Sequence, residues 1–163
     1  MKPTIKFGSL FGLTSGALTF LLYNPSIHQN KYALLLSYVY FPFLIFSIFL
    51  GVKAHTATLK LNVFTIEEAV KTGLQVLLFF AITHASLTYL FWSFVPPEYL
   101  NHLISTMQML ASKANLSPEK LAEEVENFRK TTEPFRAATT AILFDFIPGT
   151  FISIIFAFIL KKP

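Results

Sequence analysis

Long apolar stretches without charge are the main feature of the pattern along this chain. There are four such stretches, separated by polar segments, and they cover residues 7–23, 32–52, 74–94 and 137–160. At about 1.5 Å per residue each stretch is about 25–36 Å long, close to the hydrocarbon core thickness of about 30 Å. None alternates with the period of two that a β-barrel strand needs. The pattern predicts an all-α integral membrane protein with four transmembrane helices in a single domain, residues 1–163.

Composition and charge agree with this interpretation. Hydrophobic residues make up 53% of the chain and charged residues 13%, whereas about a quarter of a soluble domain is charged. Nineteen phenylalanines suit a surface that faces membrane lipids. The net charge of +4 comes with basic residues that flank the stretches, so it indicates membrane orientation and no nucleic-acid partner.

The same basic residues predict the orientation, because lysine and arginine concentrate on the cytoplasmic side of membrane helices. With four spans, the two termini and the segment 53–73 share one side, and they hold seven lysines: Lys2, Lys6, Lys53, Lys60, Lys71, Lys161 and Lys162. We therefore place both termini in the cytoplasm.

A cleaved signal peptide would also begin with basic residues, but no small-x-small cleavage site follows residue 23. We expect an uncleaved first helix.

The hydrophilic segment 97–135, between the third and fourth stretches, has a helical pattern of its own. Apolar residues recur at helical spacing on both sides of the sequence "NLSPEK". Within it, Ser117 fits a helix N-cap and Pro118 fits the first helical position. We predict an extracytoplasmic amphipathic helical hairpin. Three placements remain open: over the mouth of the bundle, on the lipid headgroups, or against a partner protein.

The sequence "FTIEEAVKTG" predicts where the third helix begins. Thr65 and Glu68 fit a capping box, in which each side chain bonds the backbone of the other residue. Glu67 and Lys71 are one helical turn apart, a spacing that allows them to pair. We expect this helix to begin at the membrane surface with a solvated first turn.

Small residues at intervals of four mark two faces for helix packing. The first stretch contains Gly8, Gly12 and Gly16, and the fourth contains Ala141, Gly149 and Ser153 in register with Asp145. Such ridges let two helix backbones approach closely in lipid. We expect the glycine ridge to pack inside the bundle, with a homo-oligomer contact as the alternative.

Asp145 lies inside the fourth stretch, in the sequence "LFDFIPG". A carboxylate deep in a bilayer costs about 2.5–3.5 kcal/mol, so it should face protein or water. His84, Tyr40 and Thr14 fall at similar depths, about 12–15 Å from the outer ends of their helices. We therefore predict an intramembrane polar layer of Asp145, His84, Tyr40 and Thr14.

Enzyme, cofactor and metal signatures are absent from the sequence. It has no phosphate-binding loop, dinucleotide fingerprint, nucleophile elbow or HExxH motif. The four histidines are far apart along the chain, and no cysteine is present to supply a thiolate ligand. We expect no catalytic residues, no cofactor and no metal, and a protein that is not an enzyme.

Several motifs together resemble the family catalogued as domain of unknown function 4199. In order, they are the spaced glycines, "FTIEEAVKTGLQ", "FVPPEYL", "LSPEKLAEE" and a last apolar stretch followed by "KK". The resemblance covers nearly the whole chain and implies a four-span protein of the bacterial inner (cytoplasmic) membrane with an external hairpin, found chiefly in Bacteroidota-type bacteria. It implies no activity and no site residues, so the polar layer is inferred from this chain alone.

Two functions fit these features. The first is a non-enzymatic subunit or assembly partner of a membrane complex, which acts by helix packing and its external hairpin on a membrane-protein partner or a second copy. The second is a small transporter or channel component with a proton- or ion-responsive layer around Asp145 and His84, because a histidine beside a carboxylate shares or exchanges a proton. A purely structural contact between them would contribute about 0.6–2 kcal/mol.

Overall fold

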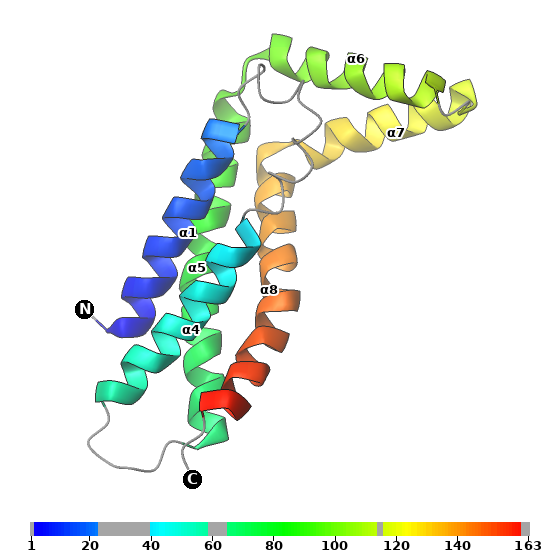
Figure 1. Cartoon of the computed structure of the whole chain (residues 1–163). Coiled ribbons are helices and arrows are strands. Elements are labelled where there is room, and N and C mark those ends of the chain that lie inside the picture. Colours follow the sequence, from blue (N-terminus) through cyan, green and yellow to red (C-terminus); the bar gives the residue numbers. More distant parts are fainter. Residues whose placement is uncertain (1, 23–39, 59–64, 114–115, 161–163) are drawn as a thin grey trace.

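The chain folds into a helical bundle with a two-helix arm, as a computed structural model shows (Figure 1). The structure describes residues 2–22, 40–58, 65–113 and 116–160. Within these ranges there are six helices and no strand: α1 (Pro3–Leu22), α4 (Tyr40–Thr58), α5 (Ile66–Phe94), α6 (Pro97–Lys113), α7 (Pro118–Thr131) and α8 (Pro134–Leu160). Helices α1, α4, α5 and α8 form the bundle, and α6 and α7 form the arm.

Three of the bundle helices are long and apolar enough to cross a membrane, namely α4, α5 and α8. They match the predicted second, third and fourth spans, although residues 32–39 of the second lie outside the described part. Helix α1 matches the predicted first span in position but is not among the three. By length and composition, the described helices therefore support a membrane protein with three candidate spans.

The capping box predicted at the start of α5 is confirmed. The Thr65 hydroxyl accepts a hydrogen bond from the Glu68 backbone N–H at 3.2 Å, and the Glu68 carboxylate accepts one from the Thr65 N–H at 3.2 Å. Two backbone donors that a helix start leaves unpaired are thereby satisfied. The helix begins eight residues before the predicted span and adds a polar first turn to it.

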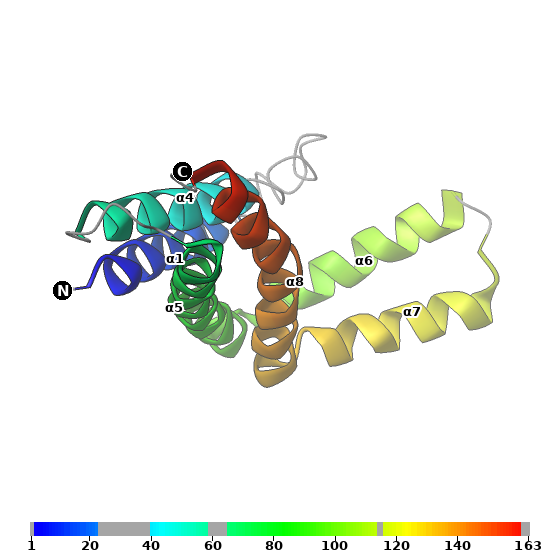
Figure 2. The same ribbon diagram turned by 90° about the horizontal axis from the view of Figure 1, so that it is seen from below.

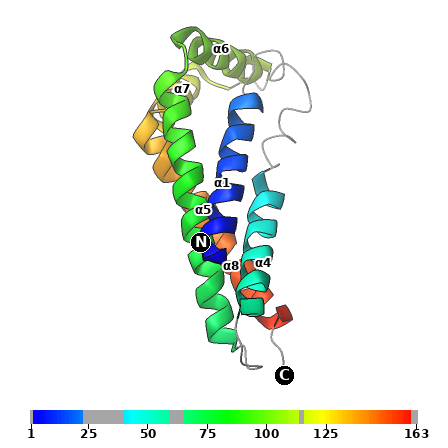
Figure 3. The same cartoon turned by 90° about the vertical axis from the view of Figure 1, so that its left-hand side faces the viewer.

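Helix α5 is the centre of the bundle, because α1, α4 and α8 all pack on it. Figure 3 shows α1 lying between α5 and α4. The core is apolar and consists of buried residues from α4, α5 and α8: Leu44, Ile48, Val52, Ala69, Val76, Leu77, Phe80 and Ala157. Since every bundle helix touches α5, its faces decide how the others are placed.

The glycine ridge of α1 lies directly against α5, as internal packing requires. A Cβ on Gly8 would lie 2.5 Å from the Val76 carbonyl oxygen, and one on Gly16 would lie 2.6 Å from Leu87 Cβ. Residue numbers therefore rise together along the two helices, which run parallel. The three glycines therefore pack inside the bundle.

The small-residue face of α8 packs on α5 in the opposite direction. Ser153 lies against Gly73, where an added Cβ would meet the serine side chain at 2.8 Å, and Gly149 lies against Leu77. Asp145 and Ser153 are fully buried, so this face is confirmed. Ala141 is the exception, since it is only half-buried near the beginning of the helix.

The segment predicted as a helical hairpin consists of two helices, α6 and α7. Ser117 is the N-cap of α7, its hydroxyl accepts from the Lys120 N–H at 3.4 Å, and Pro118 is the first helical residue. Figure 2 shows α6 and α7 reaching out to one side of the bundle. The arm therefore does not fold over the bundle mouth. It leaves the end of the bundle opposite to the start of α1 and the end of α8.

We expect Gly12→Val to lower the free energy of unfolding by about 1–3 kcal/mol, the usual cost of overpacking. Its Cβ would meet the Thr83 side chain and would lie 2.5 Å from the Phe80 carbonyl oxygen, which is backbone and cannot rotate away. Ala17→Val, on the exposed side of the same helix, should change this free energy by less than about 0.5 kcal/mol. Reversible unfolding in mixed detergent micelles measures both, and equal effects would contradict the packing.

Candidate functional site

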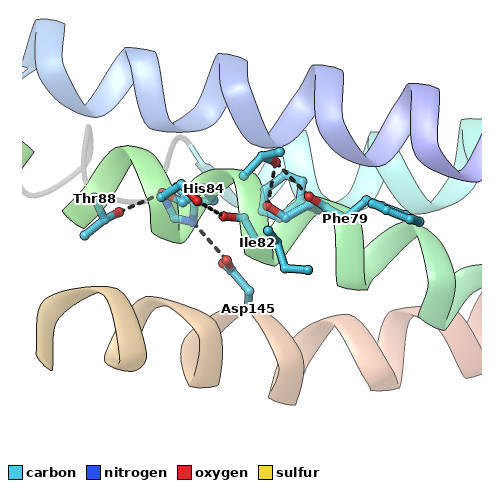
Figure 4. Close-up of polar contacts among 8 residues, drawn as sticks. Phe79, Ile82, His84, Thr88 and Asp145 are labelled. Carbon is cyan, nitrogen blue, oxygen red and sulfur yellow. Dashed lines mark hydrogen bonds and ion pairs between the residues drawn. The ribbon is translucent and has the colours of Figure 1, made fainter. Parts of the chain in front are cut away.

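The candidate site is a contact between His84 and Asp145 inside the bundle. His84 Nδ1 lies 2.9 Å from Asp145 Oδ2, within hydrogen-bond distance. Asp145 is fully buried and His84 is 9% exposed. Figure 4 shows the imidazole pointing from α5 toward the carboxylate on α8. The two residues that the sequence placed at similar depths are thus direct partners, 61 positions apart along the chain.

Antiparallel packing of two small-residue faces brings these side chains together. Asp145, Gly149 and Ser153 follow one another at intervals of four, so they lie on one side of α8. Opposite them, Gly73 meets Ser153 and Leu77 meets Gly149. Seven residues further along α5, two helical turns, His84 is therefore on the same side and level with Asp145. Close backbone approach at Gly73 and Gly149 sets the distance between the two helices.

Aromatic rings enclose the imidazole on other sides. Tyr40, the first residue of α4, stacks on His84 with ring centroids 6.0 Å apart and planes at 19°. Phe80, one turn earlier on α5, lies 5.8 Å away at 57°. The Thr88 hydroxyl donates to the His84 carbonyl at 3.0 Å. Tyr40 thus belongs to the site, as the depth argument predicted, and its ring covers the histidine.

Thr14 is not part of the site. It is exposed, and its hydroxyl donates to the Leu10 carbonyl of its own helix at 2.8 Å. The prediction used depth alone, and depth does not say which way a side chain points around the helix. The inward positions of α1 are the glycines of the ridge, and Thr14 lies between two of them on another side of the helix.

The contact can hold one proton in two ways. Either Nδ1–H of the imidazole donates to the carboxylate, or a protonated Asp145 donates to Nδ1. Asp145 Oδ1 is also buried and has no hydrogen-bond partner in the described part of the chain. A contact built only for structure would normally satisfy both oxygens. Among the described residues, the site therefore combines a shared proton position with one buried carboxylate oxygen that no side chain or backbone group pairs.

The sequence analysis did not identify a second cluster, made of aromatic rings, which lies at the base of the arm. Phe91 of α5 packs against Phe20 at 5.2 Å and against Tyr99 at 6.5 Å, both edge-on. Phe91 and Tyr99 are each 8% exposed. These rings tie the ends of α1 and α5 to the start of α6. The sequence signal was weak, because the chain contains many aromatic residues and these three have no regular spacing.

Metal ligation has no support in the geometry, since the described residues contain no group of three or more histidine, aspartate or glutamate side chains close enough to share an ion.

No curated protein matches the chain, and no solved structure does either. The model of one protein family matches residues 6–162, almost the full length. This chain belongs to that family, which is described as "Protein of unknown function (DUF4199)".

Proposed function

We propose that this protein is a non-enzymatic subunit or assembly partner of a membrane complex in the bacterial inner membrane. In this proposal four helices cross the membrane, both termini are cytoplasmic, and the arm binds a membrane-protein partner outside the cytoplasm. The observation that carries the proposal is the arm itself, which extends from the bundle and exposes apolar residues at its far end.

The packing of α1 supports a fourth span. Gly8 lies beside Val76 and Gly16 beside Leu87, so α1 runs along the middle of α5. If α5 crosses a bilayer, α1 lies at the depth of the hydrocarbon core. Its outer side carries apolar residues that suit this depth, with Leu10 52% and Leu13 48% exposed.

The arm has the surface of a binding element. Three apolar side chains near its tip, Met109, Leu110 and Leu116, are 54%, 60% and 43% exposed. No residue of α7 is buried, and its charged face carries an exposed ion pair between Lys130 and Glu126 at 3.2 Å. Exposed apolar side chains such as those at the tip are typical of a protein interface. The aromatic cluster at the base would hold the arm in position.

The topology has a direct test, because the chain has no cysteine. An impermeant maleimide should label Ser112→Cys on intact spheroplasts, since this exposed residue lies on the arm. It should label Thr58→Cys only after lysis, because the end of α4 lies at the end of the bundle opposite to the arm. The reverse labelling would invert the orientation, and labelling of both from outside would exclude crossing by α4 and α5.

We expect the double variant Met109→Ser and Leu110→Ser to co-purify at least about tenfold less partner from crosslinked membranes. Burial of each side chain contributes about 1.5–3 kcal/mol, and 1.4 kcal/mol corresponds to a factor of ten. The control is the double variant Ser105→Gln and Gln108→Ser, which alters exposed polar positions of the same helix. If the parent protein captures no specific protein, or the serine variant captures it equally well, the proposal fails.

A second function rests on the contact between His84 and Asp145. A buried histidine and carboxylate, with one carboxylate oxygen unpaired among the described residues, could respond to protons or ions, as in a small transporter or channel component. The contact joins α5 and α8, so a change in its protonation would act on the main helix pair of the bundle. This coupling of protonation to helix packing supports the second function, and it would operate even if the bundle itself contains no pore.

Asp145→Asn separates this function from a structural role, since it keeps the shape and removes the titratable group. If the site carries protons, the variant should lose at least about tenfold of any pH-driven flux in proteoliposomes while its thermal melting stays within a few degrees. Glu124→Gln removes a carboxylate on the exposed arm and should leave flux unchanged. Equal flux in Asp145→Asn and the parent protein would leave His84 and Asp145 as a structural contact only.

A further inference from the structure

A groove of about 560 Å³ runs along the outer side of α5 near its beginning, away from the faces that pack on α1 and α8. It is open to the surroundings and mainly apolar. Among the described residues it is lined by Glu67, Val70, Lys71, Leu74, Gln75 and Leu78. All six come from the first half of α5, at the end of the bundle opposite to the arm.

The polar groups of the groove follow a definite order along the helix. Glu67 comes first, Lys71 follows one turn later, and Gln75 one turn after that. At about 1.5 Å per residue, they are spaced by about 6 Å along the helix axis. Below and between them lie the apolar side chains of Val70, Leu74 and Leu78. The groove therefore passes from an anionic group to a cationic group, then to an amide, and ends on hydrocarbon.

The two charged groups are available for a ligand. Their spacing allows an ion pair, yet none joins Glu67 to Lys71 in the described structure, where the recorded pairs lie on other residues. The neighbouring Glu68 differs, because its carboxylate caps the helix through the Thr65 N–H. Glu67 and Lys71 are both exposed. A ligand with a positive group beside Glu67 and a negative group beside Lys71 would therefore pair with both side chains.

We propose that this groove binds one phospholipid with an ethanolamine headgroup, a proposal that rests on the membrane location of α5. The ligand ammonium donates to the Glu67 carboxylate, its phosphate accepts from Lys71, and an ester carbonyl accepts from the Gln75 amide. Inward of the ester carbonyl, one acyl chain lies along Leu78, and Val70 and Leu74 contact the glycerol region between the polar groups. This is the order in which a phospholipid presents its groups from the membrane surface inward.

The headgroup follows from the hydrogen-bonding chemistry of Glu67. An ethanolamine ammonium has N–H donors and can make charge-assisted bonds to a carboxylate. A choline headgroup has the same charge but no N–H donor. A glycerol headgroup has no positive charge, so its lipid is a net anion and is repelled by Glu67. The carboxylate therefore provides selectivity, whereas Lys71 attracts the phosphate that all three lipids share.

Native mass spectrometry of the full-length protein in detergent tests the proposal with matched lipids. Ethanolamine, choline and glycerol phospholipids with identical acyl chains are added in equal amounts. We expect one retained ethanolamine lipid, preferred at least about tenfold over each of the others. Glu67→Gln should remove this preference, and Lys71→Met should weaken retention of all three lipids.

Two further variants keep the test decisive. Glu68→Gln is the matched control, because glutamine also serves in a capping box, and it should retain the preference. Leu78→Trp fills the apolar floor at a position that is 44% exposed, so it should fold and release the lipid. Equal retention of the three lipids by the parent protein, or an unchanged preference in Glu67→Gln, overturns the proposal. So would a groove found to be occupied by a second copy in crosslinking. Partner capture by the arm is independent of these results.

Discussion

Close packing of small residues on α5 is the constraint on which the rest of the structure depends. Between apolar helices in lipid there is no hydrophobic driving force, so association relies on van der Waals contact and interhelical hydrogen bonds. Gly8 and Gly16 of α1 touch α5 on one side, and Gly149 and Ser153 of α8 touch it on another. A larger side chain at any of these positions would separate the helices, and at Gly149 it would also move His84 away from Asp145.

The contact between His84 and Asp145 is best understood by comparing magnitudes. Placing a carboxylate at membrane depth costs about 2.5–3.5 kcal/mol, whereas an interhelical hydrogen bond in lipid returns about 0.6–2 kcal/mol. The bond therefore offsets only part of the cost of Asp145, and an apolar residue would give a more stable bundle. Such a residue is better explained by specificity of helix pairing or by chemistry than by stability.

The arm and the bundle follow different physical rules. The inner face of α8 carries small and polar residues, and its outer face exposes phenylalanines such as Phe144 and Phe158 over 64% of their surface. The arm has the opposite pattern, with exposed charges on α7 and an apolar side shared with α6. Edge-on contacts of Phe91 connect the two parts. An exposed tip on a packed base is suitable for binding, because a partner at the tip does not contact the bundle.

Periodicity and spacing alone determined the all-helical class, the three strongly apolar helices, the hairpin, the capping box at Thr65 and the packing faces of α1 and α8. These features depend on neighbours within a few residues, which the sequence contains. Tertiary structure decided that the glycine ridge meets α5, that Thr14 points away from the site and that the arm extends sideways. It also decided that Tyr40 covers His84 and that Phe91 holds the arm. Each of these depends on the rotation of one helix relative to another, and residue spacing within a single helix does not specify that rotation.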